Sequence, residues 1–221
     1  MRNTPLFIKK YRLLLAVISG LLIPASSHAD GAWMDVNIRA NIVANTCKIN
    51  VSNGGQIQLP VVARSWFFNT DGSNKYNAAQ DAGGTRFSVQ VTDCDDIASG
   101  AASKLHFSFT PQSGSLAVGN KQVFANDKEL EGDGAKNVGL VIFSDTFHQN
   151  VLKPDGSSDV VYDVTSQQKN FAYLTDYDFY ARYQNTAAIT AGRITSNVLV
   201  NVIYERSEEH TSELQSLSRI S

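Results

Sequence analysis

Apolar and polar residues alternate with a period of two along most of this chain. The alternating segments are residues 36–42, 57–59, 87–92, 105–109, 177–183 and 198–204. Because successive side chains of a strand point to opposite faces of its sheet, this pattern predicts half-buried β-strands. A nearly continuous apolar run at residues 138–143 predicts one more strand.

Turn-forming residues separate the predicted strands. Clusters of Asn, Asp, Gly, Pro and Ser stand at residues 53–55, 71–73, 83–84, 132–134 and 154–156. These residue types favour tight turns. No segment of ten or more residues carries apolar positions at helical spacing. The chain is therefore predicted to be all-β, a sandwich or a barrel, in a single domain.

The N-terminus has the layout of a secretory signal. Lys9 and Lys10 belong to a basic region, Leu13–Ile23 is a short apolar run, and Ser27–Ala29 supplies small residues for cleavage after Ala29. The apolar run is short for a membrane span, so an uncleaved anchor is the less favoured alternative. Residues 1–29 are thus predicted to be a signal peptide, and the protein to be exported.

The C-terminal segment, residues 206–221, does not continue the strand pattern. It is polar, and it resembles the translation of a sequencing-library adapter read through a lost stop codon. We interpret it as a non-native tail that begins after Glu205; a natural disordered tail is the alternative. Without both ends the chain keeps 13 basic and 18 acidic residues, a formal net charge of −5.

Composition excludes several classes of protein. The hydrophobic share of 43% is that of a chain that folds into a globular core. The slightly acidic balance gives no electrostatic basis for binding nucleic acid or an anionic membrane. Two Cys and four His in the whole chain are too few for a cysteine-rich zinc scaffold.

Cys47 and Cys94 are the only two cysteines. In an exported protein two thiols are expected to pair, and the bond would span 47 positions of the sequence. The chain-entropy relation gives such a bond a stabilisation of about 4 kcal/mol. A reactive catalytic thiol is the alternative, but neither cysteine has a histidine partner evident in the sequence.

The sequence offers little for catalysis or metal binding. His106 stands at an outward position of its predicted strand and His148 in a polar loop, so both are expected to be solvated. The acidic residues Asp127, Glu129 and Glu131 suggest a calcium loop but lack its closing acidic residue. No nucleophile elbow, phosphate loop or zinc-protease motif is present. We expect no enzyme activity, no cofactor and no bound metal.

Aromatic residues leave a second function open. The run Trp66-Phe67-Phe68 cannot face one side of a strand, so part of it packs under a loop or meets a ligand. Tyr180 stands alone on the outer parity of its strand. An exported carbohydrate-binding β-sandwich that uses Trp66 or Tyr180 is therefore the alternative function.

A resemblance to a known family covers nearly all of residues 30–205. The chain resembles the pilin subunits of type 1-like chaperone–usher fimbriae. Five blocks carry the likeness, at residues 36–47, 87–95, 137–143, 179–183 and 192–205. The family pattern has a penultimate Tyr and a Gly fourteen residues from the end. With Glu205 as the last residue, Tyr204 and Gly192 take these two positions.

The resemblance implies an immunoglobulin-like sandwich that lacks its final strand. Residues 46–205 would form the pilin domain, and residues 30–45 an extension that completes another subunit. The inserted apolar residues of this donor strand would be Val36, Ile38, Ala40 and Ile42. The acceptor groove would lie between the first strand, near Cys47, and the last strand. The residues implied for that last strand and its approach are Gly192, Val198, Val200, Val202 and Tyr204.

The resemblance also implies partners and a place in the cell. A periplasmic chaperone would lend a strand, and an outer-membrane usher would exchange it for the extension of the next subunit. The product would be a fimbrium on the bacterial surface that contributes to adhesion, with any host receptor contacted only indirectly. Ala40 stands where the family often has Gly. The length of the chain favours a minor or adaptor subunit over the major shaft subunit.

Overall fold

The structure is a computed structural model, and its described strands all lie within residues 35–206. The residues described are 35–40, 46–94, 102–112, 115–164 and 173–206. The strands are β1 Asp35–Ala40, β2 Cys47–Val51, β3 Gln56–Gln58, β4 Thr85–Cys94, β5 Ala102–Pro111, β6 Val138–Ser144, β7 Val160–Asp163, β8 Asp176–Asn185 and β9 Ser196–Arg206. Two 3₁₀ turns join them, η1 Ser52–Gly55 and η2 Arg64–Phe67.

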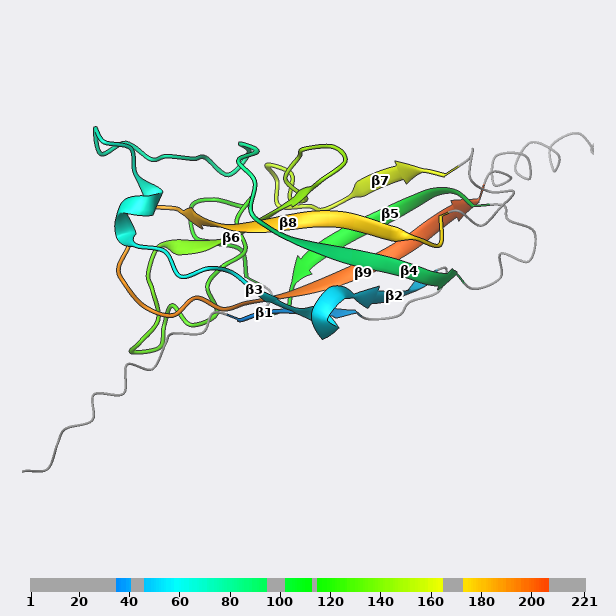
Figure 1. The fold of residues 1–221 in the computed structure, drawn as a ribbon, viewed down its shortest axis with the longest axis horizontal. Coiled ribbons are helices and arrows are strands. Elements are labelled where there is room, and N and C mark those ends of the chain that lie inside the picture. Colours follow the sequence, from blue (N-terminus) through cyan, green and yellow to red (C-terminus); the bar gives the residue numbers. More distant parts are fainter. Residues whose placement is uncertain (1–34, 41–45, 95–101, 113–114, 165–172, 207–221) are drawn as a thin grey trace, which may run out of the picture. The chain divides into compact units, whose positions relative to one another are not determined.

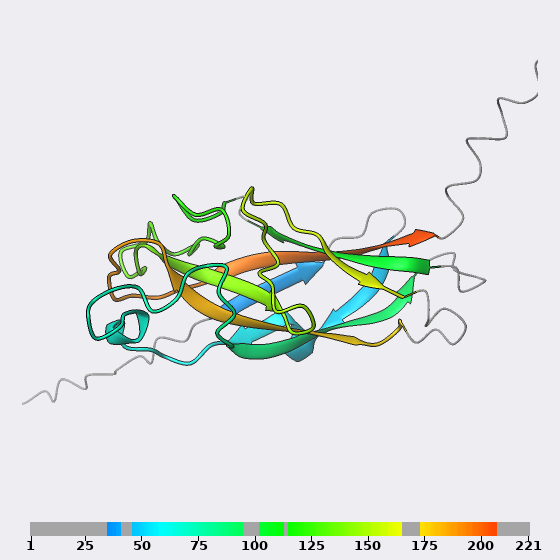
Figure 2. The same ribbon diagram turned by 90° about the horizontal axis from the view of Figure 1, so that it is seen from above.

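The strands form two layers (Figure 1). One sheet has the order β3-β1-β9-β5-β7, and the other has the order β2-β4-β8-β6. Among the described strands, neighbours pair antiparallel except β1 and β9, which run in parallel. The prediction of an all-β fold with two packed sheets is therefore confirmed, and the view from above shows the long strands of the two layers running along the same axis (Figure 2).

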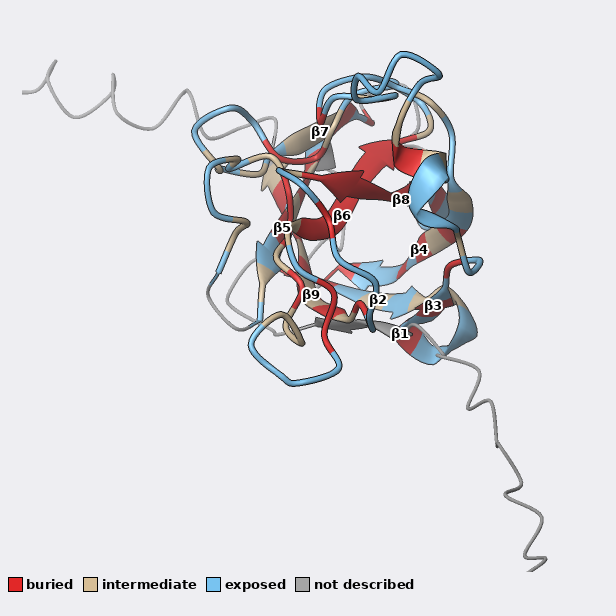
Figure 3. Cartoon of the chain, turned by 90° about the vertical axis from the view of Figure 1, so that its left-hand side faces the viewer, coloured by how far each residue is buried: buried red, intermediate tan, exposed pale blue. Residues whose placement is uncertain are grey.

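The core lies between the two sheets (Figure 3). On β4, β5 and β9 it follows from the alternation, because one parity is buried, whereas β6 and most of β8 are buried on both faces. On β5 the buried residues are Leu105, Phe107 and Phe109, and on β8 they include Tyr177 and Phe179. The rings of Phe107 and Phe109 meet the ring of Phe179 from the facing sheet at 5.8 and 5.0 Å. Aromatic contacts of this kind add to the free energy gained from burial alone.

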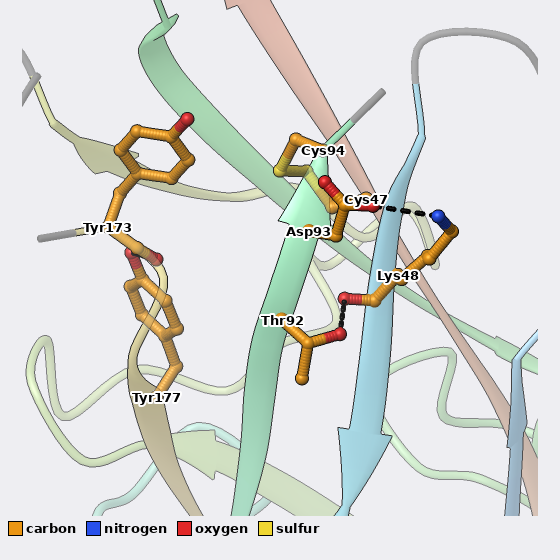
Figure 4. Close-up of a disulfide and its surroundings, with 7 residues drawn as sticks. All are labelled: Cys47, Lys48, Thr92, Asp93, Cys94, Tyr173 and Tyr177. Carbon is orange, nitrogen blue, oxygen red and sulfur yellow. Dashed lines mark hydrogen bonds and ion pairs between the residues drawn. A yellow bond between two sulfur atoms is a disulfide. The ribbon is translucent and has the colours of Figure 1, made fainter. Parts of the chain in front are cut away.

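A disulfide joins the first and second strands of the four-stranded sheet (Figure 4). Cys47 and Cys94 are directly opposite in the antiparallel pair of β2 and β4. Lys48 Nζ lies 2.7 Å from a carboxylate oxygen of Asp93 beside the bond, and Thr92 Oγ1 donates to the carbonyl of Lys48. The predicted pairing of the two cysteines is confirmed.

Some elements differ from the sequence-based expectation. The predicted strands at residues 57–59, 87–92, 105–109, 138–143, 177–183 and 198–204 correspond to β3, β4, β5, β6, β8 and β9. The strands β2 and β7 were not predicted, although Cys47–Val51 does alternate; Val160–Asp163 shows no alternation. None of the described segments is a helix long and apolar enough to cross a membrane.

Candidate strand-acceptor site

The five-stranded sheet is held together by a strand from the start of the chain. Strand β1 lies between β3 and β9 (Figure 1). Its register places Val36, Asn37, Ile38, Arg39 and Ala40 beside Ser196, Asn197, Val198, Leu199 and Val200. On its other side, β1 pairs antiparallel with the whole of β3. No pairing joins β3 directly to β9 in the described sheet, so without β1 a gap separates these two strands.

Strand β9 presents a continuous apolar face to the core beside this gap. Val198, Val200, Val202 and Tyr204 are all buried, and the outward positions between them are only partly covered. These are the residues that the resemblance implies for the acceptor strand. Of the implied donor residues, Val36, Ile38 and Ala40 lie in β1, and Ile42 lies outside the described residues.

The strand that faces β9 across the gap is β3, and β2 with Cys47 belongs to the opposite sheet. The first strand near Cys47 was expected to flank the groove. The chain changes sheets within η1, where Asn53 and Gly54 have φ of 54° and 64°. That left-handed backbone turns the chain out of one sheet and into the other. Only Thr46, just before β2, reaches β9, through an isolated bridge to Ile203.

Gly192 lies ahead of β9 and supports a turn, not the groove itself. A Cβ at this position would lie 2.4 Å from the backbone N of Ala135 and 2.5 Å from the carbonyl carbon of Gly134. Backbone hydrogen bonds link Arg193 to Asp133 and Ala135 at this contact. The glycine is needed here because two backbones approach too closely for a side chain.

The start of β9 is fixed by the loop that follows residue 125. The carboxylate of Asp127 accepts hydrogen bonds from the backbone N–H and the side-chain amide of Asn197, both at 2.8 Å. Asn126 donates to the carbonyls of Ala135 and Arg193 and accepts from the N–H of Thr195. Of the acidic residues that suggested a calcium loop, Asp127 holds β9, Glu129 accepts from the N–H of Asn137, and Glu131 pairs with Lys128. No described group of three or more His, Cys, Asp or Glu side chains could hold a metal ion.

The end of β9 is linked to β5 by a contact between the side chains of Glu205 and His106. His106 on β5 lies between two carboxylates, with Nδ1 2.9 Å from Asp159 and Nε2 3.4 Å from Glu205. Its outward orientation agrees with the sequence pattern, but the side chain is partly covered by these partners. Strand β9 is thus paired with β5 on one side, and on the other side β1 occupies the place between β9 and β3.

The outer face of β8 is not exposed, contrary to the expectation for Tyr180. Only 3% of Tyr180 is accessible, because its ring stacks on Phe143 and its hydroxyl donates to Asp81 in the segment that precedes β4. Asp81 also pairs with Nδ1 of His148 at 2.8 Å. The hydrogen bond from Tyr180 holds the pKa of Asp81 below its ordinary value, and burial raises the pKa of Tyr180.

A buried arginine anchors the same segment. Arg182 on β8 is 3% exposed and donates to the carbonyls of Asn77 and Gln80, each at 2.8 Å. It also donates to the side chain of Gln184 at 2.7 Å. Burial lowers the pKa of Arg182 to about 10, so the guanidinium stays charged at neutral pH. Nothing in the sequence distinguishes Arg182 from an arginine on the protein surface, so its burial could not be predicted.

The aromatic run at the η2 turn packs within the protein. Phe67 is buried, and the indole of Trp66 is half-buried against Phe67, Tyr76 and Tyr183 at centroid distances of 5.1 to 6.3 Å. Burial raises the pKa of Tyr183. Neither Trp66 nor Tyr180 therefore stands free on the surface as a sugar platform.

Comparison with known proteins supplies the family. Residues 36–205 match the family described as Fimbrial protein. The chain belongs to this family. The match begins within β1 and ends within β9, so it includes β1 and the two strands, β3 and β9, between which β1 lies.

Curated relatives agree with this membership of the Fimbrial protein family. The uncharacterized fimbrial-like protein YadK of Escherichia coli strain K12 is 34% identical over 207 residues, which are 90% of this chain and 96% of YadK. The minor fimbrial subunit HifD of Haemophilus influenzae is 26% identical over 195 residues, 86% of this chain and 81% of HifD. The resemblance inferred from the sequence is confirmed, and with it the interpretation as a structural subunit that is not an enzyme.

A solved structure is also similar to this member of the Fimbrial protein family. The CupB6 tip adhesin of Pseudomonas aeruginosa aligns with 55% of this chain and 36% of its own length, at 13% identity and a TM-score of 0.29. A TM-score this low does not show that the two proteins share a fold.

Proposed function

We propose that the chain is a structural subunit of a chaperone–usher fimbria and polymerises by donor-strand exchange. The gap between β3 and β9 is the acceptor for a strand from a partner, first a periplasmic chaperone and then the next subunit. Residues 30–45 are the strand that this subunit gives to its neighbour. Each subunit thus both accepts and donates, so the contact is heterologous and extends into a filament.

One observation carries this proposal. The strand between β3 and β9 comes from the segment that alternates at residues 36–42, and no other described strand fills that place. A sandwich with an open gap exposes unpaired backbone groups and a hydrophobic face, which a foreign strand satisfies. Val198, Val200, Val202 and Tyr204 supply that hydrophobic face.

Export through the periplasm and a place in a surface fimbrium follow from this function, as does a contribution to adhesion. Residues 1–29 would be removed as a signal peptide, and residues 206–221 would not belong to the natural subunit. A tail after Glu205 would also move the terminal carboxylate away from the basic chaperone residues that bind it in this family. The position in the fibre is proposed to be that of a minor or adaptor subunit, in keeping with the name of HifD.

The proposal is tested by deleting residues 30–45 behind an intact signal peptide. The deleted chain should still form a complex with the periplasmic chaperone, because that complex needs only the acceptor gap. Its incorporation into fimbriae should be lost, since it has no strand to give. Co-purification with the chaperone and immunolabelling of sheared fimbriae measure the two properties separately.

Two single substitutions serve as a matched pair in the same assay. Ile38→Asp places a charge at an apolar position of the alternating segment, and Asn37→Asp places it at the neighbouring polar position. An unpaired buried charge costs about 3 kcal/mol or more, so I38D should reduce incorporation on the order of 100-fold and N37D far less. Normal incorporation of the deleted chain, or equal effects of I38D and N37D, would contradict the proposal.

A further inference from the structure

We propose that Asn53 in the η1 turn is a site of spontaneous deamidation, and that the isoaspartate it yields loosens strand β3. In this reaction the backbone nitrogen of Gly54 loses its proton and attacks the side-chain carbonyl carbon of Asn53. A C–N bond forms, ammonia leaves, and a succinimide ring results. Water then opens the ring at either carbonyl, which gives aspartate or isoaspartate. The inference is independent of the proposed function, because it concerns the chemistry of one turn.

The residue that follows Asn53 is the first support. Asn53 is the only asparagine of the sequence that precedes a glycine. A side chain at the following position crowds the attacking nitrogen, and glycine has none. Both residues are exposed, and a Cβ built on Gly54 meets no atom within 4 Å, so water and hydroxide reach the reacting atoms.

The side chain of Asn53 is not held by the fold. Within the described residues it takes part in no hydrogen bond. Asn137 has nearly the same backbone conformation, with φ of 58° against 54° for Asn53. The side chain of Asn137, however, donates to the carbonyl of Ala188 at 2.7 Å, and its N–H donates to Glu129 at 2.9 Å. The branched Val138 follows it and crowds the nitrogen, so Asn137 serves as an internal control.

The closed turn slows the reaction. Asn53 has φ of 54° and ψ of 31°, which places the nitrogen of Gly54 nearly opposite Cβ about the Cα–C bond. The ring closes only after ψ rotates, and that rotation breaks the hydrogen bond from the N–H of Gln56 to the carbonyl of Asn53. Gly54 and Gly55, with φ of 64° and 81°, let the turn open at little steric cost. Because one backbone hydrogen bond is lost, the folded chain should react roughly two- to tenfold more slowly than the unfolded chain.

Isoaspartate changes the turn where the chain passes from one sheet to the other (Figure 1). Its backbone contains an extra methylene group, because the chain continues through the former side chain. Strand β3 begins at Gln56, directly after the turn, and β1 is its only paired neighbour in the described sheet. Ile57 at the centre of β3 is 1% exposed. A lengthened turn shifts the start of β3 and therefore weakens the packing of Ile57.

Peptide mapping by mass spectrometry tests the site in the purified full chain, incubated in mildly alkaline buffer made with heavy-oxygen water. Asn53 should become an acid first among the described asparagines, with heavy oxygen incorporated and with both aspartate and isoaspartate as products. Asn137 should keep its amide over the same period. In denaturant the conversion of Asn53 should be roughly two- to tenfold faster. The matched control is Asn53→Gly, which accepts the left-handed backbone but has no amide, and its peptide should contain no isoaspartate.

Hydrogen exchange measures the consequence for β3. The isoaspartate form, separated by chromatography, should exchange the amides of residues 56–58 faster than the unmodified chain and the aspartate form do. Three results would overturn the inference: conversion of Asn53 no faster than that of Asn137, conversion in denaturant alone, or an isoaspartate form in which these amides exchange as in the unmodified chain. All three would leave donor-strand exchange standing.

Discussion

Asp81 shows how a single side chain links two parts of the fold. Its carboxylate accepts from the hydroxyl of Tyr180 on β8, accepts from the N–H of Gly83 and pairs with His148. These interactions favour the ionised form and lower the pKa of Asp81 below 3.8, with the bond from Tyr180 the largest cause. A carboxyl group whose pKa is lowered on folding stabilises the protein at higher pH and loses that effect in acid.

The pH dependence of unfolding tests this link. The contribution of Asp81 should be fully present above the unfolded pKa of 3.8 and should fade as the pH falls through the lower folded pKa. Asp81→Asn should therefore lower the free energy of unfolding at pH 7, and the difference from the unsubstituted chain should vanish near pH 2. Denaturant titrations across this range measure it. Y180F, which removes only the hydroxyl, should reproduce most of the loss; a D81N effect that is the same at every pH would contradict the account.

At the scale of elements, the segment between η2 and β4 covers the outer face of β8. Arg182 fixes it by binding the carbonyls of Asn77 and Gln80, while the ring of Tyr76 lies 5.0 Å from the guanidinium carbon. The cover buries a small second cluster of Ala78, Val123, Val141, Phe143 and Tyr180. The docking of this segment thus depends on one buried charge with several partners.

Replacing that charge should release the segment. Arg182→Ala leaves the two carbonyls without their donor and opens a cavity, so the free energy of unfolding should fall by about 3 kcal/mol. Hydrogen exchange and limited proteolysis should locate the change at residues 68–84. The matched control is Arg86→Ala, which breaks an exposed ion pair with Asp145 and should cost under about 1 kcal/mol. Equal losses in the two variants would show that Arg182 has no special role.

The sequence predicts a strand well where one face of the strand is buried in the core and the other face is exposed. The alternation of Leu105, Phe107 and Phe109 with polar residues is that of a strand with one face in the core, and these three side chains are buried in β5. The outer face of β8 was misjudged because Tyr180 and Arg182 stand at positions of polar parity, and their cover comes from a loop that is distant in the sequence. Strand β7 has no alternation that could reveal it, and the alternation of β2 at residues 47–51 was overlooked.

For the whole molecule, the order of strands could not be derived from periodicity. The pattern at residues 36–42 predicts a strand but not its neighbours, and the place of β1 between β3 and β9 depends on contacts across most of the chain. The chain passes from one sheet to the other at η1. The residues Asn53-Gly54-Gly55 predict a turn there, but they do not predict which sheet the next strand joins. The disulfide was predictable because the chain has only two cysteines, which are expected to pair in an exported protein. The apolar face of β9 was predictable because apolar and polar residues alternate along this strand.

The central claim for the assembled state is that the strand in the gap comes from a different subunit. It is tested with two differently tagged chains, one with Arg39→Cys and the other with a cysteine at Leu199, Asn201 or Ile203, the outward positions along β9. Neither chain can form the bond within itself, and three positions allow for the unknown register between subunits. The account predicts a disulfide-linked dimer that carries both tags in isolated fimbriae for at least one position. Fimbriae that contain both chains but no such dimer at any of the three positions would contradict it.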